Sequence, residues 1–323
     1  MRKTCLDMVY QLAKQDERIF FIGSDPGVDT LKQFKKEMPE RFIIEGVSEA
    51  NLVSVAAGLA LEGKIVYANT IATFLSRRCF EQIVLDAGLH KTNVRLIANG
   101  GGLVYAPLGP THLAIDDLAI LRAVPNMTIV AVADADEMRR LMPQTVDYPG
   151  PIYIRLAKGF DPIVTNDDAP FQIGKAIVRG QGRDALIITT GITLRLALEA
   201  VGNLKEDGLD ATILHMHTVK PFDREALLKH AKDIPIIISV EEHNVIGGLG
   251  SAVAEAIAEA NFEQPKKFKR IGIQDVFPDR YGSQDSLMEY LGISPEAIVQ
   301  SIRHLRLSKK PIAELPEYEV FKQ

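Results

Sequence analysis

The sequence has no tryptophan, few cysteines and no long hydrophobic run. Its two cysteines, Cys5 and Cys79, can build neither a disulfide framework nor a cysteine-rich zinc site, and their scarcity fits a reducing compartment. No apolar segment approaches the ~20 residues that a membrane-spanning helix needs. Residues 1–18 are interrupted by charges, unlike the apolar region of a signal peptide. We therefore expect a cytoplasmic protein.

A strong excess of charge of one sign is also absent. The 323 residues contain 37 Lys and Arg against 42 Asp and Glu, which gives a formal net charge of −5. A weakly acidic chain without blocks of basic residues is not expected to have nucleic acid or an anionic membrane as its main partner. Because 46% of the residues are hydrophobic and the chain is long, two domains with full cores are expected.

Short apolar runs and amphipathic segments alternate through the first half of the chain. This alternation, with short turns rich in Gly, Pro and Asp, indicates a parallel sheet covered by helices on both faces. Such sheets bind ligands at the carboxyl ends of their strands, so the turns that follow the strands are the informative ones. The expected strands are 19–23, 42–45, 65–68, 94–98, 127–132 and 152–156, and the expected helices are 6–14, 30–38, 48–61, 74–89, 115–123 and 136–146.

A polar stretch divides the chain in two. Residues 162–170 carry two prolines and no periodic pattern, which predicts a linker between a first domain, 1–161, and a second, 171–307. Residues 308–323 have no apolar face and predict an extended tail. The expected fold class is α/β in two domains, each a mostly parallel sheet covered by helices. In the second domain the expected strands are 185–190, 211–216 and 236–241, and the expected helices are 194–204, 224–231 and 251–260.

The most informative turn lies within residues 41–62. An apolar run, 42–44, ends near a glycine, and a helical spacing of small and apolar residues begins after Ser48. Ser48 is the natural N-cap, which places Glu49 in the first helical turn, at the positive end of the helix dipole. An acid flanked by apolar sequence can hold or share a proton near neutral pH, as acid–base catalysis requires. The alternative is a glutamate that only satisfies a helix terminus.

The stretch 46–60, GVSEANLVSVAAGLA, resembles the segment that carries the cofactor-activating glutamate in transketolases and their relatives. The resemblance implies that Glu49 bonds the pyrimidine N1′ of thiamine diphosphate and relays a proton when the cofactor is activated. Phe74 matches the family's aromatic residue that stacks on the aminopyrimidine, a contact worth about 1 kcal/mol beyond the buried area. Ile71 stands where many transketolases have a second aromatic residue. Asp25, in the turn after the first expected strand, is a further candidate for cofactor binding.

Two further matches concern the substrate. Residues 109–112 form the family's Gly-Pro-Thr-His motif, in which the histidine, His112 here, reaches the substrate oxygens and the reacting carbon. Arg155 matches an arginine that binds the substrate's phosphate, which a guanidinium can bond bidentately. Leu108 and Gly100 depart from the family pattern, because they replace an acid that reads a sugar hydroxyl and a phosphate-binding histidine. The resemblance implies transfer of a two-carbon ketol unit from a ketose, with a sugar phosphate favoured, to an aldose.

The resemblance covers nearly the whole chain but only the C-terminal half of a transketolase. The family's diphosphate-binding domain is marked by Gly-Asp-Gly followed by Asn, and Gly-Asp-Gly does not occur in this sequence. Most of the cofactor's affinity lies in contacts between Mg²⁺ and the diphosphate. We therefore expect a separate N-terminal subunit to hold the diphosphate and the Mg²⁺ (or Ca²⁺ or Mn²⁺), with no metal site in this chain. Two copies of each chain would form an α₂β₂ heterotetramer.

Other interpretations are open at this point. A deoxyxylulose-phosphate synthase-like subunit, or the β-subunit of a 2-oxo acid dehydrogenase, would carry the same two domains, and Gly-Pro-Thr-His favours transketolase or the synthase. Ser48 lies in a near match to the hydrolase nucleophile elbow, with His243 as a possible base. A regulatory half without turnover is the non-enzymatic alternative. His215 and His217 form a possible metal pair, and the glycine-rich 247–251 could cradle a phosphate, although the family resemblance makes it structural.

Overall fold

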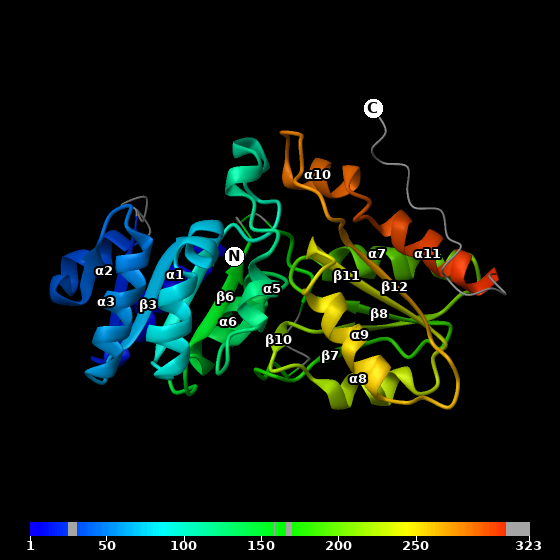
Figure 1. Ribbon diagram of the computed structural model, residues 1–323, viewed down its shortest axis with the longest axis horizontal. Coiled ribbons are helices and arrows are strands. Elements are labelled where there is room, and N and C mark those ends of the chain that lie inside the picture. Colours follow the sequence, from blue (N-terminus) through cyan, green and yellow to red (C-terminus); the bar gives the residue numbers. More distant parts are fainter. Residues whose placement is uncertain (25–30, 158, 160, 166–169, 308–323) are drawn as a thin grey trace.

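The computed structural model describes residues 1–24, 31–157, 159, 161–165 and 170–307. Figure 1 shows two units side by side, each built of a sheet with helices packed on it. The expected α/β class in two sheet-and-helix units is therefore confirmed. None of the helices in the described part combines the length and the apolar character that crossing a bilayer requires.

The first sheet has seven strands in the order β10-β5-β6-β4-β3-β1-β2. All neighbouring strands pair in parallel except β10 and β5, which are antiparallel. A parallel sheet that is covered on both faces needs nearly continuous apolar strands, which these sequences supply. The strands are β1 (Ile19–Gly23), β2 (Phe42–Ile44), β3 (Ile65–Ile71), β4 (Val94–Asn99), β5 (Thr128–Ala131), β6 (Ile152–Leu156) and β10 (Thr218–Lys220).

Helices cover both faces of the first sheet. Successive residues of a strand point to opposite faces, and accordingly Phe21 and Ile22 belong to different apolar clusters. One cluster takes side chains from α1, α2 and α6, and the other takes them from α3 and α5. The helices are α1 (Arg2–Gln15), α2 (Lys32–Glu37), α3 (Glu49–Leu61), α4 (Phe80–Gln82), α5 (Asp117–Arg122) and α6 (Ala135–Gln144), with the 3-10 turns η2 (Pro39–Arg41), η5 (Ala106–Leu108) and η6 (Pro110–His112).

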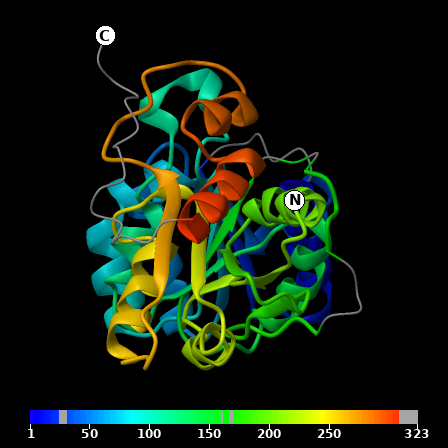
Figure 2. The ribbon, with the colours of Figure 1, turned by 90° about the vertical axis from the view of Figure 1, so that its right-hand side faces the viewer.

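The second sheet has five strands in the order β12-β11-β8-β9-β7, with only the β7–β9 pair antiparallel. Helices α7 and α11 pack on one face, and α8 and α9 pack on the other (Figure 2). The elements are β7 (Ile177–Arg179), β8 (Ala185–Thr189), β9 (Ala211–His215), β11 (Ile236–Asn244), β12 (Lys267–Ile273), α7 (Thr193–Glu206), α8 (Arg224–Ala231), α9 (Leu249–Glu259), α10 (Gln284–Tyr290) and α11 (Pro295–Leu307).

The helix expected over residues 74–89 is not one regular helix. It is built from η3 (Phe74–Arg78), α4 and η4 (Ile83–Leu89), of which η3 and η4 are π-helical. A π-turn widens the helix, and such turns are frequent at functional sites. The thiol of Cys79 donates a side-chain hydrogen bond to the carbonyl oxygen of Phe74 at 3.4 Å. The wide turn holds Phe74 and Arg78 at the start of the helix.

Candidate active site

Glu49 lies at the carboxyl edge of the first sheet, where the chain passes from β2 to α3. Its side chain is 2% exposed, and its Oε2 accepts a bond of 2.7 Å from Nη1 of Arg78. Ser48 is the N-cap residue, as expected, but its hydroxyl makes no capping bond to the helix amides. The hydroxyl instead donates to Oε1 of Glu45 at 3.2 Å. The buried carboxylate of Glu49 therefore has a charged partner from another helix.

Arg78 also joins Glu49 to the aromatic candidate. Its guanidinium carbon lies 4.5 Å from the ring centroid of Phe74, within the range of a cation–π contact. The Phe74 ring meets the ring of His112 edge to face, with centroids 5.2 Å apart and an interplanar angle of 67°. Three residues expected from the sequence therefore lie in one contact chain, and Arg78, which we did not predict, links them. The Arg77-Arg78 pair next to Phe74 was the available signal.

The loop that follows β4 carries His112 to this position. His112 ends η6, and its carbonyl oxygen accepts a bond of 3.0 Å from the hydroxyl of Thr73. Its Nδ1 lies 2.9 Å from the hydroxyl of Thr111. Ile71 is half-buried at the end of β3, the strand that leads into η3. Asp25 is outside the described residues.

Arg155 is buried rather than open to a ligand, with 6% of its side chain exposed. Its Nε donates to Oδ2 of Asp117 at 2.8 Å, and its Nη2 donates to the carbonyl oxygens of Ala114 and Glu242, each at 3.0 Å. Burial opposes its charge, but the attraction of Asp117 and Glu242 outweighs this and raises the pKa of Arg155. Arg155 therefore ties the loop after β4 to the second sheet, and its role toward a substrate phosphate stays a prediction.

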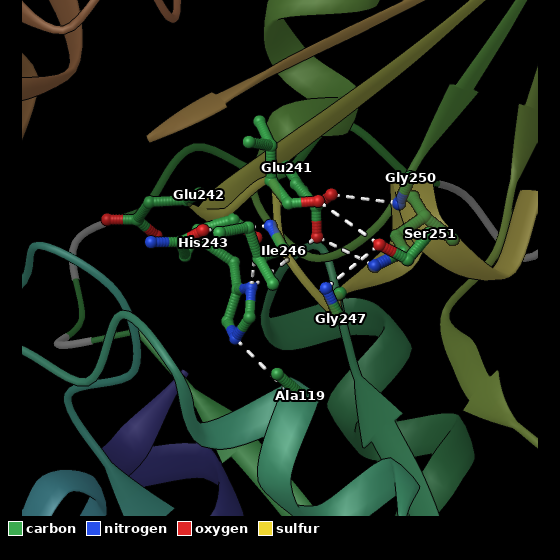
Figure 3. A network of polar contacts seen from close by, with 12 residues as sticks. Ala119, Glu241, Glu242, His243, Ile246, Gly247, Gly250 and Ser251 are labelled. Atoms are coloured by element: carbon green, nitrogen blue, oxygen red, sulfur yellow. Dashed lines mark hydrogen bonds and ion pairs between the residues drawn. The ribbon is translucent and has the colours of Figure 1, made fainter. Parts of the chain in front are cut away.

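The glycine-rich segment 247–251 is structural. Glu241 accepts bonds from the backbone amides of Leu249 at 2.7 Å and Gly250 at 2.8 Å (Figure 3). A carboxylate of the protein itself therefore occupies the amide groups of the first turn of α9. A Cβ on Gly248 would lie 2.0 Å from Oε2 of Glu241. The glycines thus allow the carboxylate to approach the helix, as the family resemblance implied, and leave no phosphate cradle.

The alternative sites are not assembled. His243 packs on α5, where its Nε2 lies 3.3 Å from the amide of Ala119, and Ser48 bonds Glu45 instead of a histidine. His215 lies 3.3 Å from Glu137. No group of three His, Cys, Asp or Glu residues in the described part of the chain could hold a metal ion. A cavity that includes Ile65 and Gly150 lies at the amino edge of the first sheet and touches none of the candidate residues.

Both units match domains of a single family. Residues 1–160 match the pyrimidine-binding domain of transketolase, and residues 174–298 match the transketolase C-terminal domain. The chain therefore belongs to the transketolase family of transferases and contains these two of its domains.

Relatives of similar length narrow the assignment to split transketolases. The chain is 36% identical over 302 residues to the 6-deoxy-6-sulfo-D-fructose transketolase subunit SqwH of Clostridium sp. (strain MSTE9), covering 93% of this chain and 92% of that protein. It is 37% identical over 305 residues to an apulose-4-phosphate transketolase subunit of Phocaeicola vulgatus, covering 93% and 95%. It therefore corresponds to the C-terminal subunit of a split transketolase, as the sequence resemblance implied.

A solved structure agrees with this assignment, whereas a longer relative belongs to the alternative family. The structure, described as a split gene transketolase, inactive beta4 tetramer, is 35% identical and superposes with a TM-score of 0.87, covering 96% of this chain and 99% of that one. A 1-deoxy-D-xylulose-5-phosphate synthase of Synechococcus sp. is 35% identical over 316 residues, but only 48% of that longer protein is covered. The split transketolases match in extent as well as in sequence.

Proposed function

We propose that this chain is the C-terminal subunit of a thiamine-diphosphate-dependent transketolase that transfers a two-carbon ketol unit from a ketose to an aldose. The observation that carries the proposal is the contact chain Glu49–Arg78–Phe74–His112 at the carboxyl edge of a parallel sheet. Ligands of open α/β sheets bind at this edge. Thiamine diphosphate, when bound, supplies the carbanion chemistry that neither protein chain can provide.

The residues of this edge fit the pyrimidine end of the cofactor. Glu49 is buried and can bond a ring nitrogen, and Phe74 offers an aromatic face beside it. His112, on the loop after β4, would bond the substrate oxygens and move a proton at them. Asp25 and Ile71 are further candidates for cofactor contacts. In this arrangement Glu49 holds or moves the proton at the pyrimidine, and Phe74 fixes the ring plane.

The diphosphate and its metal ion are assigned to a partner chain. One carboxylate on the pyrimidine cannot hold the cofactor alone, and Mg²⁺ (or Ca²⁺ or Mn²⁺) needs several oxygen ligands. Val47 and Leu108, which flank Glu49 and the Gly-Pro-Thr-His motif in sequence, are 82% and 50% exposed. Exposed apolar residues beside a polar site fit a surface that another chain covers. We assign the assembly as an α₂β₂ heterotetramer in the cytoplasm.

An anionic ketose is the favoured donor. By their names, the relative from Clostridium acts on a sulfonated sugar and the relative from Phocaeicola vulgatus acts on a phosphorylated one. In this chain His112 is the candidate to bind the sugar oxygens, and Arg155 is the candidate to bind the anionic group. The Nε and Nη2 atoms of Arg155 already bond Asp117 and two carbonyl oxygens, so the rest of the guanidinium would make this contact. Glycine at position 100 and leucine at 108 make this donor set smaller than in transketolases that place a histidine and an acid there.

The decisive experiment compares the separate and the mixed subunits. Calorimetry would measure binding of thiamine diphosphate with MgCl₂ to this chain, to a candidate partner that carries Gly-Asp-Gly, and to their mixture. We expect binding and ketol transfer only in the mixture. Tight cofactor binding and turnover of ketose by this chain alone would overturn the proposal. Consumption of pyruvate with an aldose phosphate, in place of ketol transfer, would assign the synthase activity instead.

A further inference from the structure

The loop that carries His112 rests on a buried carboxylate of the second unit. Glu242, on β11, is 3% exposed, and its Oε1 accepts a bond of 2.7 Å from the backbone amide of Leu103. The same oxygen accepts a bond of 2.7 Å from Nε2 of Gln284, at the start of α10. One carboxylate oxygen therefore joins the first unit's loop to two elements of the second unit.

The glycines at the base of this loop make room for the contact. A Cβ on Gly102 would lie 2.4 Å from Cδ of Glu242, and a Cβ on Gly101 would lie 2.5 Å from Cγ of Arg155. Gly102 also has a φ of +67°, which favours glycine. Gly101 and Gly102 therefore leave the space that the side chains of Arg155 on β6 and Glu242 on β11 occupy. A larger residue at position 102 would push the loop away from Glu242.

The far end of the loop is held by the same unit. A Cβ on Gly109 would lie 2.8 Å from Cε1 of Tyr281, and Gly109 directly precedes the Pro110–His112 turn. Tyr281 belongs to the segment between β12 and α10, which lies beside the loop in Figure 1. Both ends of the loop after β4 therefore contact the second unit, although the residues assigned to the candidate active site all come from the first.

We propose that Glu242 is a positioning residue that, through the Leu103 amide and Gln284, fixes the loop on which His112 meets the substrate. The catalytic consequence rests on the proposed function, whereas the effect on the loop does not. The second unit would then act on the reaction indirectly, by setting the loop geometry, since a small displacement of a positioned group can lower the rate strongly.

The chemistry of the contact explains why an acid is suited to this place. Removing the carboxylate would leave the buried amide of Leu103 without its acceptor. Burial raises the pKa of Glu242 to about 7, against the attraction of Arg155. Either protonation state keeps an oxygen that can accept from Leu103, so Glu242→Gln should preserve the contact that Glu242→Ala removes. Glu241 is a matched control, because it is also buried and its carboxylate accepts hydrogen bonds from amides of α9 in its own unit instead of from the loop.

Hydrogen–deuterium exchange of the full chain tests the loop directly. We expect Glu242→Ala to speed exchange of the 99–112 amides by about tenfold or more, as loss of a buried hydrogen bond predicts. Glu242→Gln should stay near the wild type, and Glu241→Gln should leave this loop unchanged. Unchanged exchange at Leu103 in folded Glu242→Ala would overturn the proposal. If Glu242→Ala does not fold, Gln284→Ala, at a half-buried position, takes its place with the same expected direction.

Kinetics of the complex with the partner chain test the consequence. We expect Glu242→Ala to lower kcat/KM by about tenfold and Glu242→Gln to restore most of it. The dissociation constant of thiamine diphosphate should not change, because Glu49 and Phe74, which we assign to the pyrimidine, are not altered. An equal loss in Glu241→Gln, or weakened cofactor binding in Glu242→Ala, would indicate a general structural role and overturn the proposal. If the wild-type complex does not transfer ketol units while exchange behaves as expected, the proposed function fails and the loop contact stands.

Discussion

The carboxylate of Glu49 is paired with the guanidinium of Arg78 at 2.7 Å, although the two residues lie 29 positions apart. The pair is asymmetric, because 2% of the Glu49 side chain is exposed against 49% for Arg78. The charge of a buried acid is thus balanced from the solvent side. The same guanidinium covers Phe74, so one side chain contacts both residues that we assign to the pyrimidine.

Replacement of Glu49 tests the proton relay. We expect Glu49→Gln to fold normally. We expect the turnover of the assembled enzyme to fall by a factor of about 10²–10⁴, because an amide cannot accept or relay the proton. Steady-state rates and thermal unfolding of the same preparation check both statements. Near-wild-type turnover would show that Glu49 only caps its helix.

Replacement of Arg78 should have a smaller effect of the same kind. Arg78→Gln removes the cation beside Glu49 and its contact with Phe74, and we expect turnover to fall by about tenfold or less, since a half-exposed ion pair contributes modestly. Arg77→Gln is the control, because Arg77 bonds Asp116 at 2.8 Å and the carbonyl oxygen of Leu113 at 3.2 Å, but not Glu49. Equal losses in the two variants would remove Arg78 from the site.

Phe74 should affect cofactor binding more than chemistry. Phe74→Leu keeps an apolar side chain but loses the ring, so we expect the dissociation constant of thiamine diphosphate in the assembled complex to rise about fivefold, the equivalent of ~1 kcal/mol of stacking. Calorimetry of the complex measures this value. An unchanged dissociation constant would mean that Phe74 serves only to pack against His112.

Arg155 is expected to affect stability as well as substrate binding. Arg155→Ala would leave the fully buried Asp117 without its cation, and breaking a buried pair costs about 3–5 kcal/mol. Urea unfolding measures the change in unfolding free energy. A variant of normal stability whose KM rises only for phosphorylated sugars would instead favour the phosphate-binding role.

His217 should give the protein a measurable loss of stability in acid. Burial lowers the pKa of His217 from 6.5 to about 4, with Glu137 opposing the shift and His215 and Arg140 reinforcing it. His217 therefore becomes protonated below pH ~6.5 in the unfolded chain, but only near pH ~4 in the folded chain. The unfolding free energy should fall by up to about 3 kcal/mol over this window.

The rings of His217 and Phe171 are stacked, with centroids 4.0 Å apart. The control for this prediction is His217→Phe, which keeps an aromatic ring against Phe171. Burial raises the pKa values of Glu241 and Glu242 to about 7, so their contribution to the protein's stability falls as pH rises, which is the opposite direction to that of His217. The difference between wild type and variant isolates His217. A difference that does not depend on pH between 4 and 6.5 would contradict the assignment.

The parallel strands of the first unit and the position of Glu49 could be predicted because local patterns carry them. Each expected strand of that unit is present, since a buried parallel strand reads as a short apolar run whatever its neighbours are. Phe74 and His112 were each proposed as site residues from family motifs, and in the structure their ring centroids lie 5.2 Å apart.

Several of the missed features depend on contacts that are distant in sequence, although β12, α10 and α11, which were not predicted either, are longer elements. The strands β7 and β10 have three residues each and show no period of their own. The salt bridge of Arg155 with Asp117 spans 38 residues, and a sequence motif cannot distinguish a buried arginine from one that faces a ligand. The π-turns of residues 74–89 have the spacing of an ordinary helix when read as a sequence.

The strand β10 makes separation of the two units hazardous. It comes from the second half of the chain, yet it pairs with β5, whose four residues are all buried. A chain cut in the linker would expose β5 as an open apolar edge, which is a template for aggregation. Chimaeras that exchange C-terminal domains between relatives must therefore keep a segment that can pair with β5, because the sheet of the first unit is completed by a strand from the second half of the chain.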